Sequence, residues 1–131
     1  MSLRPAFFRR GSGTLTVMVA SPTQRTLQAL RKQSYIAAVV EKWNAHARIR
    51  QDLFGCIDVL GCNDEGIIGI QATTKPNARA RLKKAWQEPR LAQWLRSGAR
   101  FEVWGWHRMP NGRWHCQITP VSMDDLTSEA T

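Results

Sequence analysis

The stretch that decides the fold is Asp52-Leu-Phe-Gly-Cys-Ile-Asp58-Val-Leu-Gly-Cys-Asn-Asp-Glu-Gly-Ile-Ile-Gly-Ile-Gln71-Ala-Thr73-Thr-Lys75. Its centre, Asn63-Asp64-Glu65-Gly66, consists of residue types that favour tight turns. On either side of this turn the sequence is rich in Ile, Val and Leu. The pattern predicts a β-hairpin, with one strand at 53–60 and a second at 67–73.

The turn also predicts which residues of the hairpin face each other. If Cys62 pairs with Ile67 across the turn, then Asp58 lies opposite Gln71. Because side chains alternate along a strand, Gln71 and Thr73 share one face of the sheet with Asp58. The hairpin therefore places an acid, an amide and a hydroxyl on one face.

The residues before this hairpin predict a helix and a further strand. Ser21-Pro22-Thr23-Gln24 is a helix-start signature, with Ser as the N-cap, Pro in the first turn and Gln three residues after the cap. The helix is expected to run to about Gln33. Residues 35–42 are apolar and β-branched, which favours a strand, and residues 44–51 then form a basic connection.

After the hairpin the pattern becomes helical and then returns to strands. Residues 77–97 have helical periodicity, and Pro89 is expected to break them into two pieces. The segments 100–106 and 113–119 flank Asn111-Gly112, a strong hairpin signal. The order is one helix, three strands, a helical segment and two strands, which predicts an α/β fold.

Length and composition fit one domain of this kind. The chain has 131 residues, of which 43% are hydrophobic, which argues for a packed core and against general disorder. We expect a single domain at 21–120, a flexible N-terminal arm at 1–20 and a loose tail at 121–131. The three cysteines form no CxxC pair, so reduced thiols in a cytoplasmic protein are expected.

Charge is the unusual property of the composition. Nineteen Lys and Arg against ten Asp and Glu give a net charge of +9. Such an excess favours polyanionic partners, either nucleic acid or an anionic membrane surface. No apolar run approaches the roughly 20 residues that a membrane-spanning helix needs, so no membrane insertion is expected.

The predicted hairpin face is a candidate metal site. Magnesium prefers oxygen ligands and keeps several waters, so an acid on one strand and an amide on its neighbour can hold it, or manganese in its place. Such an ion promotes the attack of water on a phosphodiester. The competing interpretation is that Asp58 is a polar residue on a solvated face. Against it, Asp58 lies within an apolar strand, where an unpaired acid costs free energy.

The element order, together with Ile57-Asp58-Val59-Leu60, the turn and Ile68-Gly69-Ile70-Gln71-Ala72-Thr73, resembles the PD-(D/E)XK nuclease superfamily. The resemblance is to small archaeal-type Holliday-junction resolvases and related phage endonucleases, and it extends from about Pro22 to Thr119. It implies a restriction-endonuclease-like domain with a central mixed sheet flanked by helices. It also implies DNA cleavage with magnesium, in a phage or bacterial setting, by a homodimer.

The resemblance assigns roles to individual residues. Asp58 matches the first acid of the motif, Gln71 stands where a second acid is expected, and Thr73 stands where a lysine is expected. These substitutions depart from the family, because an amide is a neutral ligand and threonine carries no charge. The metal ligands would be Asp58, Gln71 and the Ala72 carbonyl, and Lys75 could replace the missing lysine.

The resemblance also calls for a further acid. Glu41 is preferred to Asp52, because six residues of strand separate Asp52 from Asp58 by about 20 Å. A bend at Gly55 would change that conclusion.

Basic residues around the hairpin form a candidate nucleic-acid surface. Contacts of this kind hold a phosphate backbone without reading its sequence, although a charge run is often only a solvated helix face. Trp106 is the candidate for stacking on an unpaired base. The candidate phosphate contacts are Arg48, Arg50, Lys75, Arg79, Arg81, Lys83 and Lys84.

The sequence therefore predicts a magnesium-dependent endonuclease that acts on DNA, including branched DNA. One alternative is a DNA-binding or partner-binding protein on a degenerate nuclease scaffold, because the second acid and the lysine are missing. An RNA-processing enzyme of the same fold is a third alternative.

Overall fold

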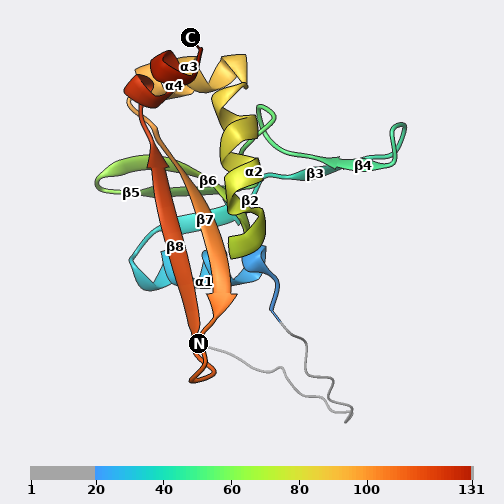
Figure 1. The fold of residues 1–131 in the computed structure, drawn as a ribbon, viewed down its shortest axis with the longest axis vertical. Coiled ribbons are helices and arrows are strands. Elements are labelled where there is room, and N and C mark those ends of the chain that lie inside the picture. Colours follow the sequence, from blue (N-terminus) through green and yellow to red (C-terminus); the bar gives the residue numbers. More distant parts are fainter. Residues whose placement is uncertain (1–19, 131) are drawn as a thin grey trace.

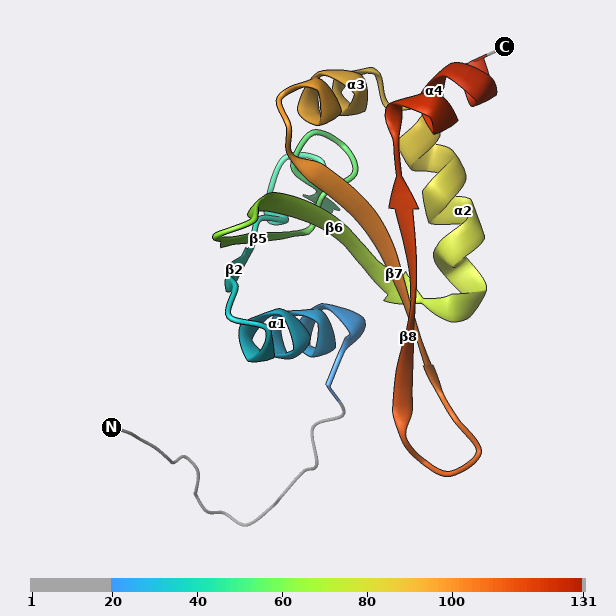
Figure 2. The same ribbon diagram turned by 90° about the vertical axis from the view of Figure 1, so that its left-hand side faces the viewer.

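The computed structural model describes residues 20–130, and the side chains of residues 20–127, as an α/β domain with one central sheet (Figures 1 and 2). The arm expected at 1–20 lies outside the described residues, apart from Ala20. The elements are α1 (Pro22–Lys32), β2 (Ile36–Val39), β3 (Lys42–Asn44), β4 (Ile49–Gln51), β5 (Val59–Asn63), β6 (Gly66–Thr74), α2 (Lys75–Trp86), α3 (Pro89–Arg96), β7 (Arg100–Arg108), β8 (Trp114–Val121) and α4 (Met123–Ala130).

The central sheet has five strands in the order β2-β5-β6-β7-β8. All neighbours are antiparallel except β6 and β7, which are parallel and are joined through α2 and α3. Helix α1 packs on one face over a core around Leu30, Ile70 and Trp104. Helices α2, α3 and α4 pack on the other face over a core around Leu91 and Phe101. The predicted α/β class and the mixed sheet flanked by helices are confirmed.

Helix α1 begins as its sequence predicts. The Ser21 hydroxyl oxygen accepts a hydrogen bond from the Gln24 backbone N–H at 3.2 Å, which satisfies one of the free donors of the first turn. Leu27 and Leu30 are buried against the sheet. The capping residue and the apolar stripe together fix where the helix starts and which face it buries.

The register of the central hairpin is also as predicted. Cys62 pairs with Ile67, and the turn is held by the Asn63 side chain, whose oxygen accepts from the Glu65 backbone N–H at 2.8 Å. The ladder continues to Val59 opposite Ile70. The next pair along the two chains is therefore Asp58 and Gln71.

The predicted start of the first hairpin strand is wrong. The strand was expected at 53–60, but β5 begins at Val59, and residues 53–57 form a tight turn instead. Leu53 and Ile57 exchange two backbone hydrogen bonds, of 2.7 and 3.0 Å, and both Phe54 and Gly55 have positive φ. Glycine adopts this conformation without strain, so Gly55 permits the chain to reverse at this point.

A second, two-stranded hairpin formed by β3 and β4 interrupts the chain between β2 and β5. The strand expected at 35–42 ends at Val39, and the connection expected at 44–51 contains β4. Asn44 shapes the turn, because its side-chain oxygen accepts from the backbone N–H groups of His46 and Ala47. The hairpin projects away from the body of the domain (Figure 1). We call residues 42–51 the arm; it is distinct from the N-terminal arm that was expected at 1–20.

The C-terminal segment is ordered into a helix, contrary to the loose tail expected at 121–131. Ser122 and Asp125 cap α4 reciprocally: the Asp125 carboxylate accepts from the Ser122 N–H at 2.8 Å, and the Ser122 hydroxyl accepts from the Asp125 N–H at 3.4 Å. Leu126 is buried in the core beneath α2 and α3. None of the helices in the described range 20–130 is long and apolar enough to cross a membrane.

Candidate functional site

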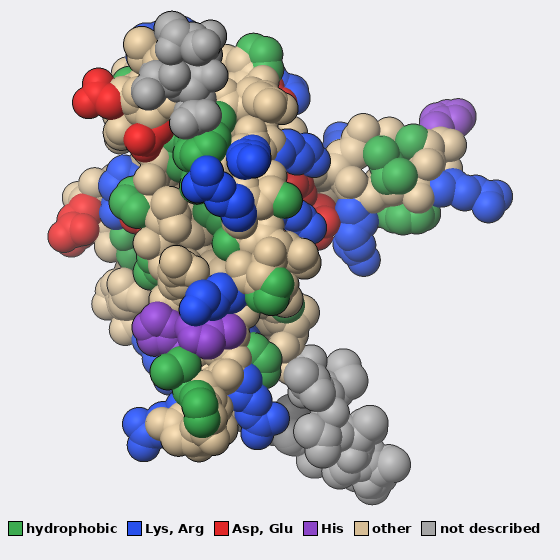
Figure 3. All heavy atoms as spheres, in the orientation of Figure 1, with side chains coloured by type: hydrophobic (Ala, Val, Ile, Leu, Met, Phe, Trp, Pro, Cys, Tyr) green, Lys and Arg blue, Asp and Glu red, His purple; other side chains and the backbone are tan. Residues whose placement is uncertain are grey.

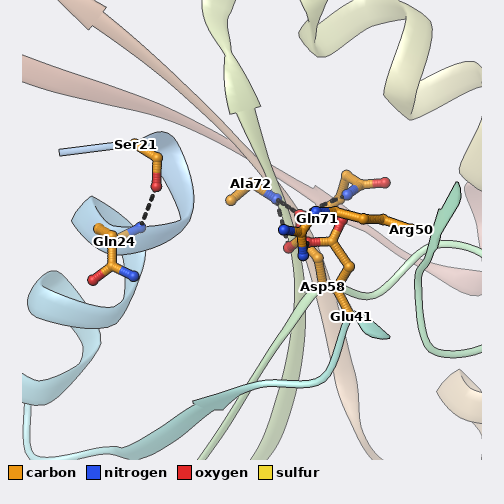
Figure 4. Close-up of polar contacts among 7 residues, drawn as sticks. All are labelled: Ser21, Gln24, Glu41, Arg50, Asp58, Gln71 and Ala72. Carbon is orange, nitrogen blue, oxygen red and sulfur yellow. Dashed lines mark hydrogen bonds and ion pairs between the residues drawn. The ribbon is translucent and has the colours of Figure 1, made fainter. Parts of the chain in front are cut away.

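The candidate site is centred on Asp58, which is only 5% exposed. Its carboxylate accepts a hydrogen bond from Gln71 Nε2 at 2.9 Å and another from the Ala72 backbone N–H at 3.0 Å (Figure 4). Both donors lie on β6, opposite the start of β5. The predicted juxtaposition of Asp58 and Gln71 is therefore present, with the nitrogen of the amide facing the acid.

The environment of Asp58 disfavours its charged form. Burial raises the pKa of Asp58 from its ordinary value of 3.8 to about 7, and the negative charges of Asp52 and Glu41 act in the same direction. The hydrogen bonds from Ala72 and Gln71 oppose this rise without cancelling it. Near neutral pH the carboxyl group is consequently poised between its protonated and charged forms.

Two further acids lie within electrostatic range of Asp58. Glu41, the expected third acid, follows β2 and forms an ion pair with Arg50 of the arm at 4.0 Å (Figure 4). Asp52 was disfavoured because a continuous strand would hold it about 20 Å away. The turn at 53–57 removes that distance, since Asp52 and Asp58 flank the paired residues Leu53 and Ile57.

Thr73 and Lys75 lie further along the same chain segment. Thr73 is buried and is the register partner of Gly105 on β7. A Cβ atom on Gly105 would stand 3.1 Å from both Lys75 Cα and Ala78 Cβ, so glycine allows the first turn of α2 to lie close against the sheet. Lys75 is exposed, and its charge helps to lower the pKa of His107 on β7. Among the described contacts of Asp58 there is none to Lys75.

A cavity of about 590 Å³ lies next to these acids, between the arm, the turn at 53–57 and helices α2 and α3. Its charged lining consists of two acids, Asp52 and Glu88, and four basic residues, Lys42, Arg50, Lys84 and Arg90. We call this cavity the cationic cleft. Figure 3 shows Lys and Arg side chains on the side of the body that faces the arm and on the arm itself.

The structure divides the predicted basic residues into three groups. Arg50 and Lys84 line the cationic cleft, and Arg48 lies at the turn of the arm. Lys75, Arg79, Arg81 and Lys83 lie on α2 but do not line the cleft. Sequence reasoning missed Lys42 and did not single out Arg90 from the basic residues after the hairpin, because the cleft is formed by segments that are distant in the chain.

The donors around Asp58 fit some metal ions better than others. Within residues 20–130 no three His, Cys, Asp or Glu side chains are close enough together to form a metal-binding cluster. Magnesium and manganese need fewer protein ligands, because they keep several waters and are often held by one or two carboxylates. One buried carboxylate, the Gln71 side-chain oxygen and the Ala72 carbonyl are a donor set of that kind. For Gln71 to contribute, its amide would have to present oxygen in place of nitrogen.

Trp106 and two of the cysteines lie in surroundings that do not favour a chemical role. Trp106, the expected stacking residue, is half-buried, and its indole N–H donates to the Thr26 hydroxyl at 3.0 Å beneath α1. The thiols are free, but burial raises the pKa of Cys56 and of Cys116 to about 12, so both are protonated at neutral pH. Neither thiol is therefore an available nucleophile.

Comparison with known proteins adds no family to this picture. Neither a protein-family model, nor a curated protein sequence, nor a solved structure is significantly similar to the chain. The fold and the site together define an α/β domain with a buried acid beside a cationic cleft.

Proposed function

We propose that the protein is a magnesium-dependent or manganese-dependent endonuclease that hydrolyses DNA, with a restriction-endonuclease-like fold. The observation that carries this proposal is the buried Asp58 carboxyl group, whose pKa is raised to about 7, next to the cationic cleft. Strongly perturbed acids in or beside clefts are a frequent mark of functional sites. The order α1, β2, β5, β6 and α2 is also the order on which the resemblance to PD-(D/E)XK nucleases rests.

The proposed roles follow from the positions of the residues. Lys42, Arg50, Lys84 and Arg90 bind the phosphate backbone in the cationic cleft and bring it toward the acids. Asp58, the Gln71 oxygen and the Ala72 carbonyl would hold the metal ion, whose chemistry is to activate water and offset the charge that develops on phosphate. Asp52 and Glu41 add negative charge around this position, which attracts a divalent cation.

Cleavage assays test the proposal directly. Labelled single-stranded, duplex, flap and four-way-junction DNA, with a matched RNA strand, would be incubated with magnesium or manganese. We expect metal-dependent cutting of DNA that falls at least about 100-fold in Asp58→Asn, because electrostatic stabilisation by a metal contributes several kcal/mol and each 1.4 kcal/mol is tenfold in rate. Lys75→Ala in the same assay tests whether this lysine takes part.

The cationic cleft makes a separate prediction about salt dependence. Lys84 lines the cleft, whereas Lys32 is exposed at the end of α1, on the opposite face of the sheet. Lys84→Gln is expected to reduce the slope of log Kd against log salt concentration by about 1, the effect of losing one phosphate contact. Lys32→Gln is the control and should leave the slope unchanged. If the slope of log Kd against log salt concentration were the same for both variants, the cleft would not be part of the DNA-binding surface.

One observation favours a second candidate, a non-catalytic DNA-binding protein on the same scaffold. The hydrogen bonds from Gln71 and Ala72 satisfy the Asp58 carboxylate without a metal. Such a protein would bind DNA equally well with and without a chelator and would cut none of the substrates. The cleavage assay, repeated as a binding assay with chelator, separates the two candidates.

A further inference from the structure

A second pocket, of about 400 Å³, opens beside the cationic cleft and is mostly apolar. Phe54, Trp94, Arg90, Gln93 and Ser97 line it, and we call it the aromatic pocket. Phe54 and Arg90 also line the cationic cleft, so the two cavities share a wall. A ligand with one flat apolar part and one anionic part would therefore meet complementary surfaces in both cavities at once.

The backbone holds the ring of Phe54 in an unusual position. Its φ is +52°, a left-handed conformation that is strained for a residue with a side chain. In spite of its size, Phe54 is 40% exposed instead of being packed in the core. Its ring centroid lies 6.1 Å from that of Trp94, at an interplanar angle of 55°. Strain of this kind is concentrated at ligand sites.

The position of Arg90 between the two cavities is fixed by Glu88. The Glu88 carboxylate accepts from Arg90 Nε at 2.9 Å and from Nη2 at 3.1 Å, which orients the guanidinium group. That group lies 5.9 Å from the Phe54 ring centroid. A Cβ atom on Gly55 would overlap the Glu88 carboxylate, so the turn at 53–57 is packed directly against this ion pair.

We propose that the aromatic pocket binds an unpaired nucleobase of the substrate while the adjoining phosphate lies in the cationic cleft. This inference rests on the proposed nuclease function and specifies its substrate class. Aromatic rings stack on any base. The Gln93 amide, whose oxygen already accepts from Arg96, has N–H groups left to donate to the edge of the base. In an intact duplex the bases are stacked and paired, so the pocket favours single strands, flaps and junctions.

The test measures binding without cutting, using full-length Asp58→Asn in the presence of chelator. The probes are a duplex and the same duplex with a single-stranded flap, whose first unpaired base is 2-aminopurine. We expect the flap to bind about tenfold more tightly than the duplex, a size typical of stacking one base, and the fluorescence of 2-aminopurine to fall on binding. Phe54→Leu, added to this background, should bring the ratio of flap affinity to duplex affinity close to one. It should leave the affinity for the duplex unchanged.

Two further variants make the result specific to the pocket. Ser97→Leu fills the pocket with a side chain that cannot stack on a base, from an exposed position at the end of α3, and should cause the same loss of preference. Trp114→Leu is the matched control, because Trp114 is 39% exposed and lies on β8, outside the pocket. It should keep the preference. The unchanged duplex affinity of each variant reports that it is folded.

Different outcomes would refute the proposed base pocket and the proposed nuclease function. Equal binding of flap and duplex, or a preference that survives in Phe54→Leu, would refute the base pocket and leave the nuclease proposal standing. A preference lost in Trp43→Leu but kept in Phe54→Leu would assign base recognition to the arm, where Trp43 is 58% exposed, and would also refute the pocket. Failure to bind any DNA would refute the proposed function itself.

Discussion

Asp58→Asn is expected to stabilise the metal-free protein at pH 8 by up to about 4 kcal/mol, although polar substitutions at buried sites usually destabilise. The pKa of Asp58 rises from 3.8 to about 7 on folding, so the folded protein retains a proton that the unfolded chain releases. The free energy of unfolding therefore falls as pH rises from about 4 to about 7. Above pH 7 Asp58 is ionised, and the full destabilisation by its buried charge is present. Asparagine carries no charge and removes this cost, while its amide oxygen can still accept from the Ala72 N–H.

The measurement is the free energy of unfolding in urea, between pH 4 and pH 8, in the presence of a chelator. The difference between Asp58→Asn and the parent should be small at pH 4 and grow toward pH 8. Asp64→Asn is the control, because Asp64 is an exposed acid in the turn between β5 and β6, and it should show no such growth. A difference that stays constant from pH 4 to pH 8 would mean that ionisation of Asp58 does not destabilise the folded protein.

Gln71→Glu should have the opposite effect, and it creates the second acid that the nuclease motif expects. Gln71 is 1% exposed, and its Nε2 lies 2.9 Å from an oxygen of Asp58. A glutamate there removes a hydrogen-bond donor and places two carboxylates in contact. We expect a loss of about 3–5 kcal/mol at pH 8 without metal, the usual cost of an uncompensated buried charge.

Acid and metal should each relieve this loss. At pH 5 the two carboxyl groups can share a proton, so the destabilisation should shrink. Magnesium should raise the melting temperature of Gln71→Glu more than that of the parent, because two acids bind the cation more tightly than an acid and an amide. Gln71→Met is the control: it loses the same donor without adding charge and should not respond to magnesium. A similar magnesium response in both variants would argue against a cation site at Asp58.

The parts of the fold that follow from local signals could be predicted from the sequence. The Ser21 cap, the turn at 63–66 and the Asn111-Gly112 turn each specify their own geometry, and the hairpin turn then placed Asp58 opposite Gln71. The helix α4 was missed, although Ser122 and Asp125 have the spacing of reciprocal caps.

The parts that depend on three-dimensional packing could not be predicted in this way. Residues 53–60 alternate like a strand, yet the left-handed conformations of Phe54 and Gly55 reverse the chain. The contact of that turn with Glu88, which is more than thirty residues away, is not visible in any local pattern. The same turn brings Asp52 near Asp58. The cationic cleft likewise joins distant segments, which is why Lys42 was not anticipated and Arg90 was not singled out.

The turn at 53–57 connects the two halves of the proposed site mechanically. Two backbone hydrogen bonds between Leu53 and Ile57 close the turn, with Phe54 near its tip and Asp52 and Asp58 at its base. Only this short turn separates Phe54, which lines the aromatic pocket, from Asp52 and Asp58. A substitution that changes the backbone of this turn, such as a larger residue at Gly55, is therefore expected to disturb the aromatic pocket and the placement of the two acids together.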